Sequence, residues 1–152
     1  MVSIKSGLLG GVVATFAISA IVQMKKATGS LPDVHLLNAW SALVGEPTHL
    51  AAGWITHLVV SIIVGGIGFA LLSSKLPSRS FAIKGAAFGV LMWLMIMLVV
   101  MPLAGAGVFA SHQSAMAPAA ILVLYLIYGL ILGQFYRSDV SNARLQKTSR
   151  SG

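Results

Sequence analysis

The sequence predicts an all-α integral membrane protein: a four-transmembrane-helix bundle with both termini cytoplasmic and a short amphipathic helix in the first outer loop. Composition is the first observation. The 152 residues are 57% apolar and only 9% charged, with a mean hydropathy of +0.92, whereas about 25% of a soluble domain is charged. The second is a set of apolar stretches, each long enough to cross a hydrocarbon core. The third is the uneven distribution of basic residues between these stretches.

Four apolar stretches are the predicted spans, at residues 7–24, 50–72, 85–101 and 116–136. The first lies between Lys5 and Lys25, and we expect a retained span there rather than a cleaved signal peptide. No Asp, Glu, Lys or Arg occurs between Lys84 and Arg137, an interval too long for one helix. Pro102 and the glycines after it therefore predict the break between the third and fourth spans.

The connections differ in kind. Residues 34–44 mix polar residues with the apolar residues Val34, Leu37, Trp40, Ala42 and Val44, and they predict a short amphipathic helix at the membrane surface. Asp33 would cap the start of this helix and Gly45 would end it. Residues 137–152 are few in apolar side chains and hold four basic ones. They predict a mobile, basic cytoplasmic tail that lies against anionic lipid.

The distribution of the basic residues predicts the orientation of the chain, which we expect in the cell (inner) membrane. Two of the ten, Lys25 and Lys26, fall on one side of the predicted spans. The other eight fall on the opposite side: Lys5, Lys75, Arg79, Lys84, Arg137, Arg144, Lys147 and Arg150. Because cytoplasmic loops are enriched in Lys and Arg, both termini are expected to face the cytoplasm.

Small residues recur four positions apart in all four spans, a spacing that lets helix backbones approach closely in lipid. The candidate helix-packing positions are Gly7, Gly11, Ser61, Gly65, Gly85, Gly89, Gly129 and Gly133. The first and third spans also open alike, with Ile-Lys, this glycine pair and then a valine. A duplicated helix pair and a chance likeness of glycine-rich helices both remain open. Either way, the glycines predict a tight bundle with little room for a central pore.

His57 is the one histidine that lies well inside a predicted span. It begins a polar or small stripe of the second span: His57, Ser61, Gly65 and Gly68. Such a stripe should face protein rather than lipid, and an intramembrane histidine is a functional hypothesis by default. The alternative, which we favour, is a neutral structural imidazole bonded to a carbonyl group or to Tyr125 or Tyr128 of a neighbouring helix.

The other histidines fall near the outer side, with His49 before the second span and His112 before the fourth. Neutral imidazole is a ligand for haem iron and copper, so His57 with His49 or His112 is a candidate site for haem b or copper. The spacing matches no established metal-binding pattern. We therefore expect no cofactor and keep haem b or copper as the alternative.

The rarity of acidic residues excludes several functions. Asp33, Glu46 and Asp139 are the only carboxylates, and none lies in a predicted span. Paired-carboxylate hydrolysis and an intramembrane carboxylate proton relay therefore lack their residues. There is no cysteine for a thiolate nucleophile, and the positive charge follows topology rather than a nucleic-acid groove. We expect no enzymatic activity.

Several segments together resemble a family of small uncharacterised four-helix membrane proteins of bacteria and archaea. They are G-L-L-G-G-V-V-A-T at 7–15, W-I-T-H-L-V-V-S-I-I-V-G at 54–65, M-P-L-A-G-A-G-V-F at 101–109 and L-I-Y-G-L-I-L-G-Q-F-Y at 126–136. The resemblance covers residues 5–136 and carries no established activity. By analogy it implies company with respiratory oxidases. The family pattern has a histidine before the Tyr-Gly of the last helix, where this chain has Ile127, and the departure counts against a His–His pair across the bundle.

Two functions remain. The first is a non-catalytic accessory subunit of a larger integral-membrane complex, of the electron-transfer (respiratory) kind, that packs through its glycine-rich helix faces. Its partners would be other integral-membrane subunits and lipid or quinone, and not nucleic acid. The alternative is a small membrane protein that binds haem b or copper through its outer-side histidines. A solute carrier is a weaker third, because no charge lies within the spans.

Overall fold

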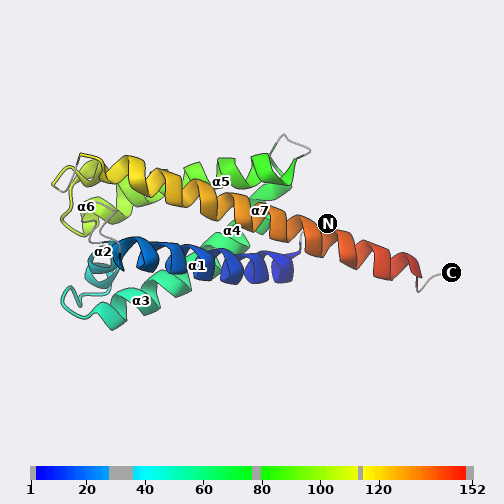
Figure 1. Cartoon of the computed structure of the whole chain (residues 1–152), viewed down its shortest axis with the longest axis horizontal. Coiled ribbons are helices and arrows are strands. Elements are labelled where there is room, and N and C mark those ends of the chain that lie inside the picture. The colour runs from blue at the N-terminus through cyan, green and yellow to red at the C-terminus, as the bar shows by residue number, and fades with distance from the viewer. Residues whose placement is uncertain (1–2, 28–35, 77–79, 113–114, 150–152) are drawn as a thin grey trace.

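The computed structural model describes residues 3–27, 36–76, 80–112 and 115–149 (Figure 1). These residues form helices and turns and include no strand. The helices are α1 (Ile4–Ala27), α2 (Leu36–Leu43), α3 (Leu50–Val59), α4 (Gly66–Ser73), α5 (Phe81–Met95), α6 (Met101–Leu103) and α7 (Ala117–Ser149). Two π-helical segments, η1 (Val60–Gly65) and η2 (Ile96–Val100), join α3 to α4 and α5 to α6, and η3 (Val108–Ala110) is a short 3₁₀ turn.

Four helical segments of the described chain are long and apolar enough to cross a membrane, which indicates a multi-pass membrane protein. They are Ile4–Met24, Leu50–Ser73, Phe81–Leu103 and Ala117–Arg137. Each contains or closely overlaps one of the four stretches expected from the sequence. The third differs most, because the helix continues through Pro102 instead of ending before it. The π-type turn of η2 directly precedes this proline, where a widened helix relieves the clash of the ring with the preceding turn.

The four spans alternate in direction along one long axis (Figure 1). The described start of α1, the turn from α4 to α5 and the end of α7 lie at one end of the bundle, which we call the termini end. At the opposite end, the loop end, lie α2, α6 and η3. Two antiparallel helix pairs, α1 with α4 and α5 with α7, approach closely along the bundle.

Glycine permits both close pairs. A Cβ added to Gly85 would strike the carbonyl oxygen of Gly129, and one added to Gly133 would strike that of Phe81. In the other pair, a Cβ on Gly66 would lie 2.6 Å from the carbonyl oxygen of Gly7. No side-chain rotation relieves such a clash because the obstacle is backbone. The close approach of these helices therefore depends on the missing side chains.

The two pairs share one register. Gly7 faces Gly66 and Ala70 just as Gly85 faces Gly129 and Gly133. One turn further on, Gly11 faces the carbonyl oxygen of Ile62 and Gly89 faces that of Tyr125. Position 7 corresponds to 85 and 11 to 89, while 62, 66 and 70 correspond to 125, 129 and 133. This equal spacing in each partner helix supports duplication of a helix pair over chance similarity.

An aromatic cluster fills the core toward the termini end. The ring of Phe69 lies edge-on to Phe88 and to Tyr136, with both pairs of ring centroids 5.4 Å apart. All three side chains are buried. The hydroxyl oxygen of Tyr136 accepts a hydrogen bond from the backbone N–H of Ser3 at 3.0 Å, which fixes the start of α1. The core is therefore continuous across three of the spans.

The short helix expected at 34–44 is present as α2, although Asp33 lies outside the described residues. Gly45 adopts a φ of +78°, and the N–H groups of Gly45 and Glu46 bond the carbonyls of Ala42 and Ser41. This is the glycine-based stop of a Schellman motif. Trp40 is only 1% exposed, so the apolar face of α2 packs on protein.

The basic segment after the fourth span is helical, and its mobility and its contact with anionic lipid stay predictions. In the structure α7 does not end near residue 136 but continues as helix to Ser149, beyond the end of the bundle (Figure 1). No glycine or proline follows Gly133 until Gly152, so nothing in this segment interrupts the helical backbone.

Candidate functional site

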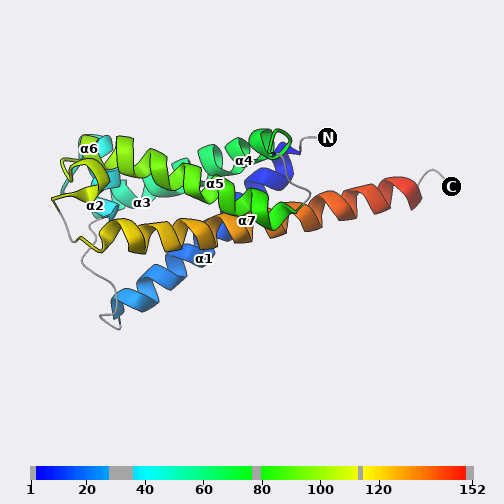
Figure 2. The ribbon, with the colours of Figure 1, turned by 90° about the horizontal axis from the view of Figure 1, so that it is seen from above.

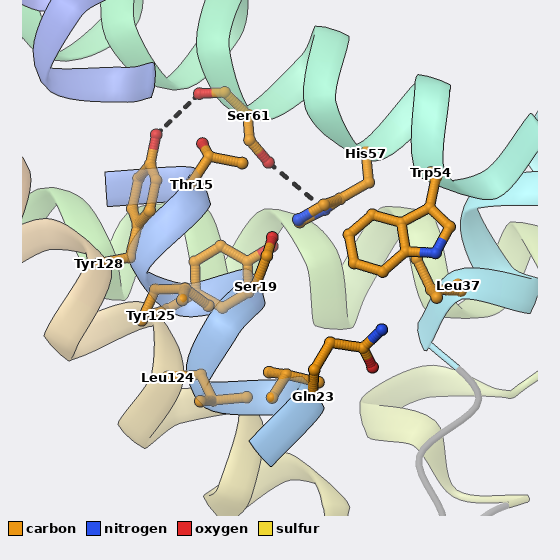
Figure 3. Close-up of a pocket in the computed structure, with 12 residues that line it drawn as sticks. Thr15, Ser19, Gln23, Leu37, Trp54, His57, Ser61, Leu124, Tyr125 and Tyr128 are labelled. Atoms are coloured by element: carbon orange, nitrogen blue, oxygen red, sulfur yellow. Dashed lines mark hydrogen bonds between the residues drawn. The ribbon is translucent and has the colours of Figure 1, made fainter. Parts of the chain in front are cut away.

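A cavity of about 70 Å³ lies among α1, α3 with η1, and α7, within the apolar part of the bundle (Figure 3). Twelve side chains line it, and none of them is charged at neutral pH in the ordinary state of the group. They are Thr15, Ile18, Ser19, Val22, Gln23, Leu37, Trp54, His57, Ser61, Leu124, Tyr125 and Tyr128. The cavity thus combines hydroxyl, amide and imidazole groups with aromatic and aliphatic walls.

The course of α1 creates this cavity. Near the termini end α1 packs on α4 and η1, and along its length it contacts α7. Toward the loop end it separates from α3, as the view from above shows (Figure 2). The glycine contact of Gly7 with Gly66 brings the helices together at one end. The two helices therefore diverge from this contact toward the loop end, where the gap lies (Figure 2).

His57 is the central polar group. Its ring points into the cavity, and Nδ1 lies 3.4 Å from Oγ of Ser61, one turn along the same helix (Figure 3). The ring contacts Trp40 and Trp54, with centroids 5.8 and 6.2 Å away. Two indole rings from α2 and α3 therefore hold the imidazole in place. Trp40 is itself buried, and its Nε1 has no hydrogen-bond partner among the described residues.

A second hydrogen bond ties α7 to the same turn. The hydroxyl of Tyr128 donates to the carbonyl oxygen of Ser61 at 2.7 Å. Gly65 makes this possible, because a Cβ there would collide with the Tyr128 hydroxyl. Ser61 and Gly65 both belong to η1, the π-helical segment. Single-turn π segments are frequent at functional sites, and this one presents a carbonyl oxygen to a neighbouring helix.

The α1 wall carries a polar stripe at successive helical turns, Thr15, Ser19 and Gln23. Thr15 lies next to Tyr128 (Figure 3). The hydroxyl oxygens of Thr15 and Ser19 are buried, yet neither has a hydrogen-bond partner of normal geometry in the described part of the chain. A buried polar group without a partner costs about 1–3 kcal/mol. The cavity therefore contains hydrogen-bonding capacity that this chain leaves unused.

The structure separates the candidate histidines. His49 is exposed and pairs with Glu46, with Nε2 3.6 Å from the carboxylate oxygen. His112 is exposed too, and its Nδ1 lies 3.1 Å from the carbonyl oxygen of Gly105. Neither lines the cavity that His57 and Tyr125 line. Among the residues that the structure describes, no three His, Cys, Asp or Glu side chains come close enough to hold a metal ion together.

Most of the predicted helix-packing positions lie in the contacts of α1 with α4 and of α5 with α7, but two of them have other roles. Ser61 and Gly65 contact Tyr128, whereas Gly66 is the residue that meets α1. From the sequence, Gly66 is recognised only as the partner of Ala70 in a small-residue pair, Thr15 and Ser19 are not identified as site residues, and Trp40 is not placed beside His57. Thr15, Ser19 and Gln23 at four-residue spacing were a detectable signal, because polar residues on one face of a span should face protein. Trp40 gave none, since nothing local places it against His57.

The chemistry available at this site is binding rather than proton transfer between carboxylates. No acidic side chain lines the cavity, and the imidazole is its one group with ordinary acid–base character near neutrality. The hydroxyls and the imidazole can both donate and accept hydrogen bonds. The site can therefore hold a small neutral polar group inside an apolar environment.

Comparison with known proteins gives a family without an activity. A family model described as a family of unknown function, DUF6789, matches residues 1–145. No curated protein and no solved structure matches the chain.

Proposed function

This chain belongs to DUF6789, and because that family has no assigned activity, we propose from the chain's own residues that it is a non-catalytic accessory subunit of a larger integral-membrane assembly. The other integral-membrane subunits and the surrounding lipid would be its partners. An electron-transfer, respiratory assembly is the class to test first, by the analogy that the family resemblance offers.

One observation carries this proposal: the bundle is open on one side. The separation of α1 from α3 leaves the span Leu50–Ser73 the least covered of the four. In its apolar 18-residue stretch 28% of the residues are buried, against 39% in the two most buried spans. Next to the span Leu50–Ser73, the buried hydroxyl of Ser19 has no hydrogen-bond partner among the residues that the structure describes. Inside a bilayer no water meets such groups, so a molecule from outside the chain is the natural partner.

The sequence predicts that a partner packs on the glycine-rich helix faces, but these glycines contact other helices of the same chain. Gly7, Gly85 and Gly129 are occupied in contacts within the chain. A partner would therefore bind not on these glycines but on the large apolar side chains that remain exposed, such as Phe16 at 60% and Ile55 at 64%. Van der Waals packing is the main source of such association in lipid.

The orientation in the membrane is part of the proposal. We place the termini end, where Lys5, Lys75, Lys84 and Arg137 lie among the described residues, on the cytoplasmic side of the inner membrane. Fusion of a reporter that is active only in the cytoplasm to the C-terminus should give activity, and fusion within residues 28–35 should not. The reverse pattern would contradict this orientation.

Native electrophoresis tests the assembly. Membranes of the source organism are solubilised in a mild detergent, and the tagged full-length chain is followed on a native gel together with the spectra of haem-containing bands. Co-migration with a large complex, retained when the detergent is changed, supports an accessory subunit. Migration at the mass of one to four copies in every detergent refutes it.

Binding of haem b or copper by His57 stays the alternative. A dry cavity that takes one benzene molecule is about 150 Å³. The cavity of about 70 Å³ is therefore too small to enclose a haem, although a single copper ion would fit. The purified chain should then show stoichiometric copper that is lost on His57→Ala. A colourless, metal-free preparation contradicts this alternative and leaves the accessory-subunit proposal untouched.

A further inference from the structure

The cavity has a depth that limits what can enter it. His57 follows the start of its span, Leu50, by about two turns of helix, or about 10 Å along the axis. Half of a hydrocarbon core is about 15 Å. The group bound here therefore lies deep in the apolar layer, below the level at which phosphate headgroups reside.

The charge of the lining restricts the ligand further. No Lys or Arg lines the cavity, so a phosphate or carboxylate drawn to this depth would have no counter-ion. No Asp or Glu lines it either, which disfavours a cation. A neutral head avoids both difficulties.

One buried hydroxyl indicates which neutral head fits. Ser19 Oγ is buried and has no hydrogen-bond partner in the part of the chain that the structure describes, and a hydroxyl with a free proton donates to a carbonyl oxygen. His57 faces the same space from the opposite wall (Figure 3). The cavity volume of about 70 Å³ holds more than one water molecule but is smaller than the about 150 Å³ of a cavity that takes a benzene ring.

We propose that this cavity binds the neutral, carbonyl-bearing head of a membrane-soluble molecule, with Ser19 as a hydrogen-bond donor and the apolar tail leaving between α1 and α3. A neutral acyl ester lipid and a quinone both carry this chemistry. The small enclosed volume favours the acyl ester, and a quinone would insert only one carbonyl edge. The inference goes beyond the assembly proposed above and does not depend on it, because the lining belongs to this chain alone.

The test uses the full-length chain in phosphatidylcholine nanodiscs. Two probes are titrated separately: a monoacylglycerol with a brominated acyl chain, and a benzoquinone with a ten-carbon tail. Both quench tryptophan fluorescence, and Trp54 lines the cavity. Brominated phosphatidylcholine serves as the reference for unspecific quenching by bulk lipid.

Three variants separate the site from general lipid contact. Ser19→Ala removes the donor and Ser19→Leu fills the cavity. Thr56→Ala is the matched control, because it removes a hydroxyl next to His57 that does not line the cavity. We expect saturable quenching by one probe, roughly five- to tenfold weaker binding in Ser19→Ala, no saturable component in Ser19→Leu, and unchanged binding in Thr56→Ala. Saturation with the monoacylglycerol identifies an acyl ester, and saturation with the benzoquinone identifies a quinone.

A stability measurement without ligand gives an independent readout. Because Ser19 Oγ has no hydrogen-bond partner among the described residues, Ser19→Ala without ligand should unfold at the same or a higher fraction of SDS than the parent chain. Non-saturable quenching by both probes, or equal binding in all variants, overturns the proposal. So does a clear loss of ligand-free stability in Ser19→Ala, since the hydroxyl would then already be satisfied by bound water.

Discussion

Gly85→Ala should loosen the α5–α7 pair. The added Cβ would lie 2.8 Å from the carbonyl carbon of Gly129 and 3.2 Å from Cα of Gly133, whereas ordinary contact begins near 3.4 Å. The nearest obstacle is the carbonyl oxygen of Gly129, and because all of these atoms are backbone, the helices must separate by more than the about 0.6 Å that the carbonyl carbon alone requires. Overpacking costs about 1–3 kcal/mol, and a direct collision with a backbone oxygen belongs to the upper part of that range, about 2–3 kcal/mol. The gain from replacing glycine by alanine in a helix offsets up to ~1 kcal/mol of this cost. We expect a net loss of about 1–2 kcal/mol.

The assay is unfolding by SDS in mixed micelles, followed by far-ultraviolet circular dichroism. Gly68→Ala is the matched control, because its Cβ would lie 3.4 Å from the ring of Phe88, an ordinary contact. That variant should be as stable as the parent or more stable, by up to ~1 kcal/mol. If Gly85→Ala unfolds at the same SDS fraction as Gly68→Ala, the backbones of α5 and α7 are not in close contact at Gly85, and the expected overpacking is refuted.

Three further substitutions can be measured in the same titration. Tyr128→Phe removes the hydrogen bond to the Ser61 carbonyl and should cost about 0.6–1.7 kcal/mol, a range typical of hydrogen bonds between transmembrane helices; no change would mean that water replaces the hydroxyl. Gly45→Ala should cost about 1–2 kcal/mol although nothing lies within 4 Å, because its φ of +78° is unfavourable for a residue with a Cβ; a neutral result would show that α2 ends differently. Lys84→Met removes the ammonium group that bonds the carbonyl of Ser73 at the end of α4, and should cost about 0.3–1 kcal/mol, less at high salt; a salt-independent loss would point to packing instead.

The spans and their small-residue faces could be read from sequence because both are local properties. Apolar length decides whether a segment such as 50–72 can cross a membrane, and helical spacing decides which residues share a face. The stop at Gly45 was also local, since the turn requires a positive φ at that residue. Helix ends were less certain: Pro102 did not end its helix, because the π-type turn before it accommodates the ring.

The site could be predicted only in part. His57 stood out because it is an imidazole inside an apolar span, and Tyr128 was named as a neighbour. The actual link runs through Ser61, whose hydroxyl lies near His57 and whose carbonyl accepts from Tyr128. Trp40 reaches the imidazole from a separate helix. Such contacts depend on how helices cross, which no local pattern specifies.

Composition and periodicity alone thus determined that this is a four-span, all-helical chain with closely packing faces and no paired carboxylates. Those properties follow from the solvent and from backbone geometry, which act on each segment separately. Only the tertiary structure decided which glycine meets which helix and where a gap remains. Gly7 meets Gly66 at one end, so α1 and α3 part at the other, and the hydroxyl of Ser19 is left buried without a partner. How two helices cross depends on both of them, and the crossing of α1 with α3 places the polar stripe of α1 at the wall of a cavity.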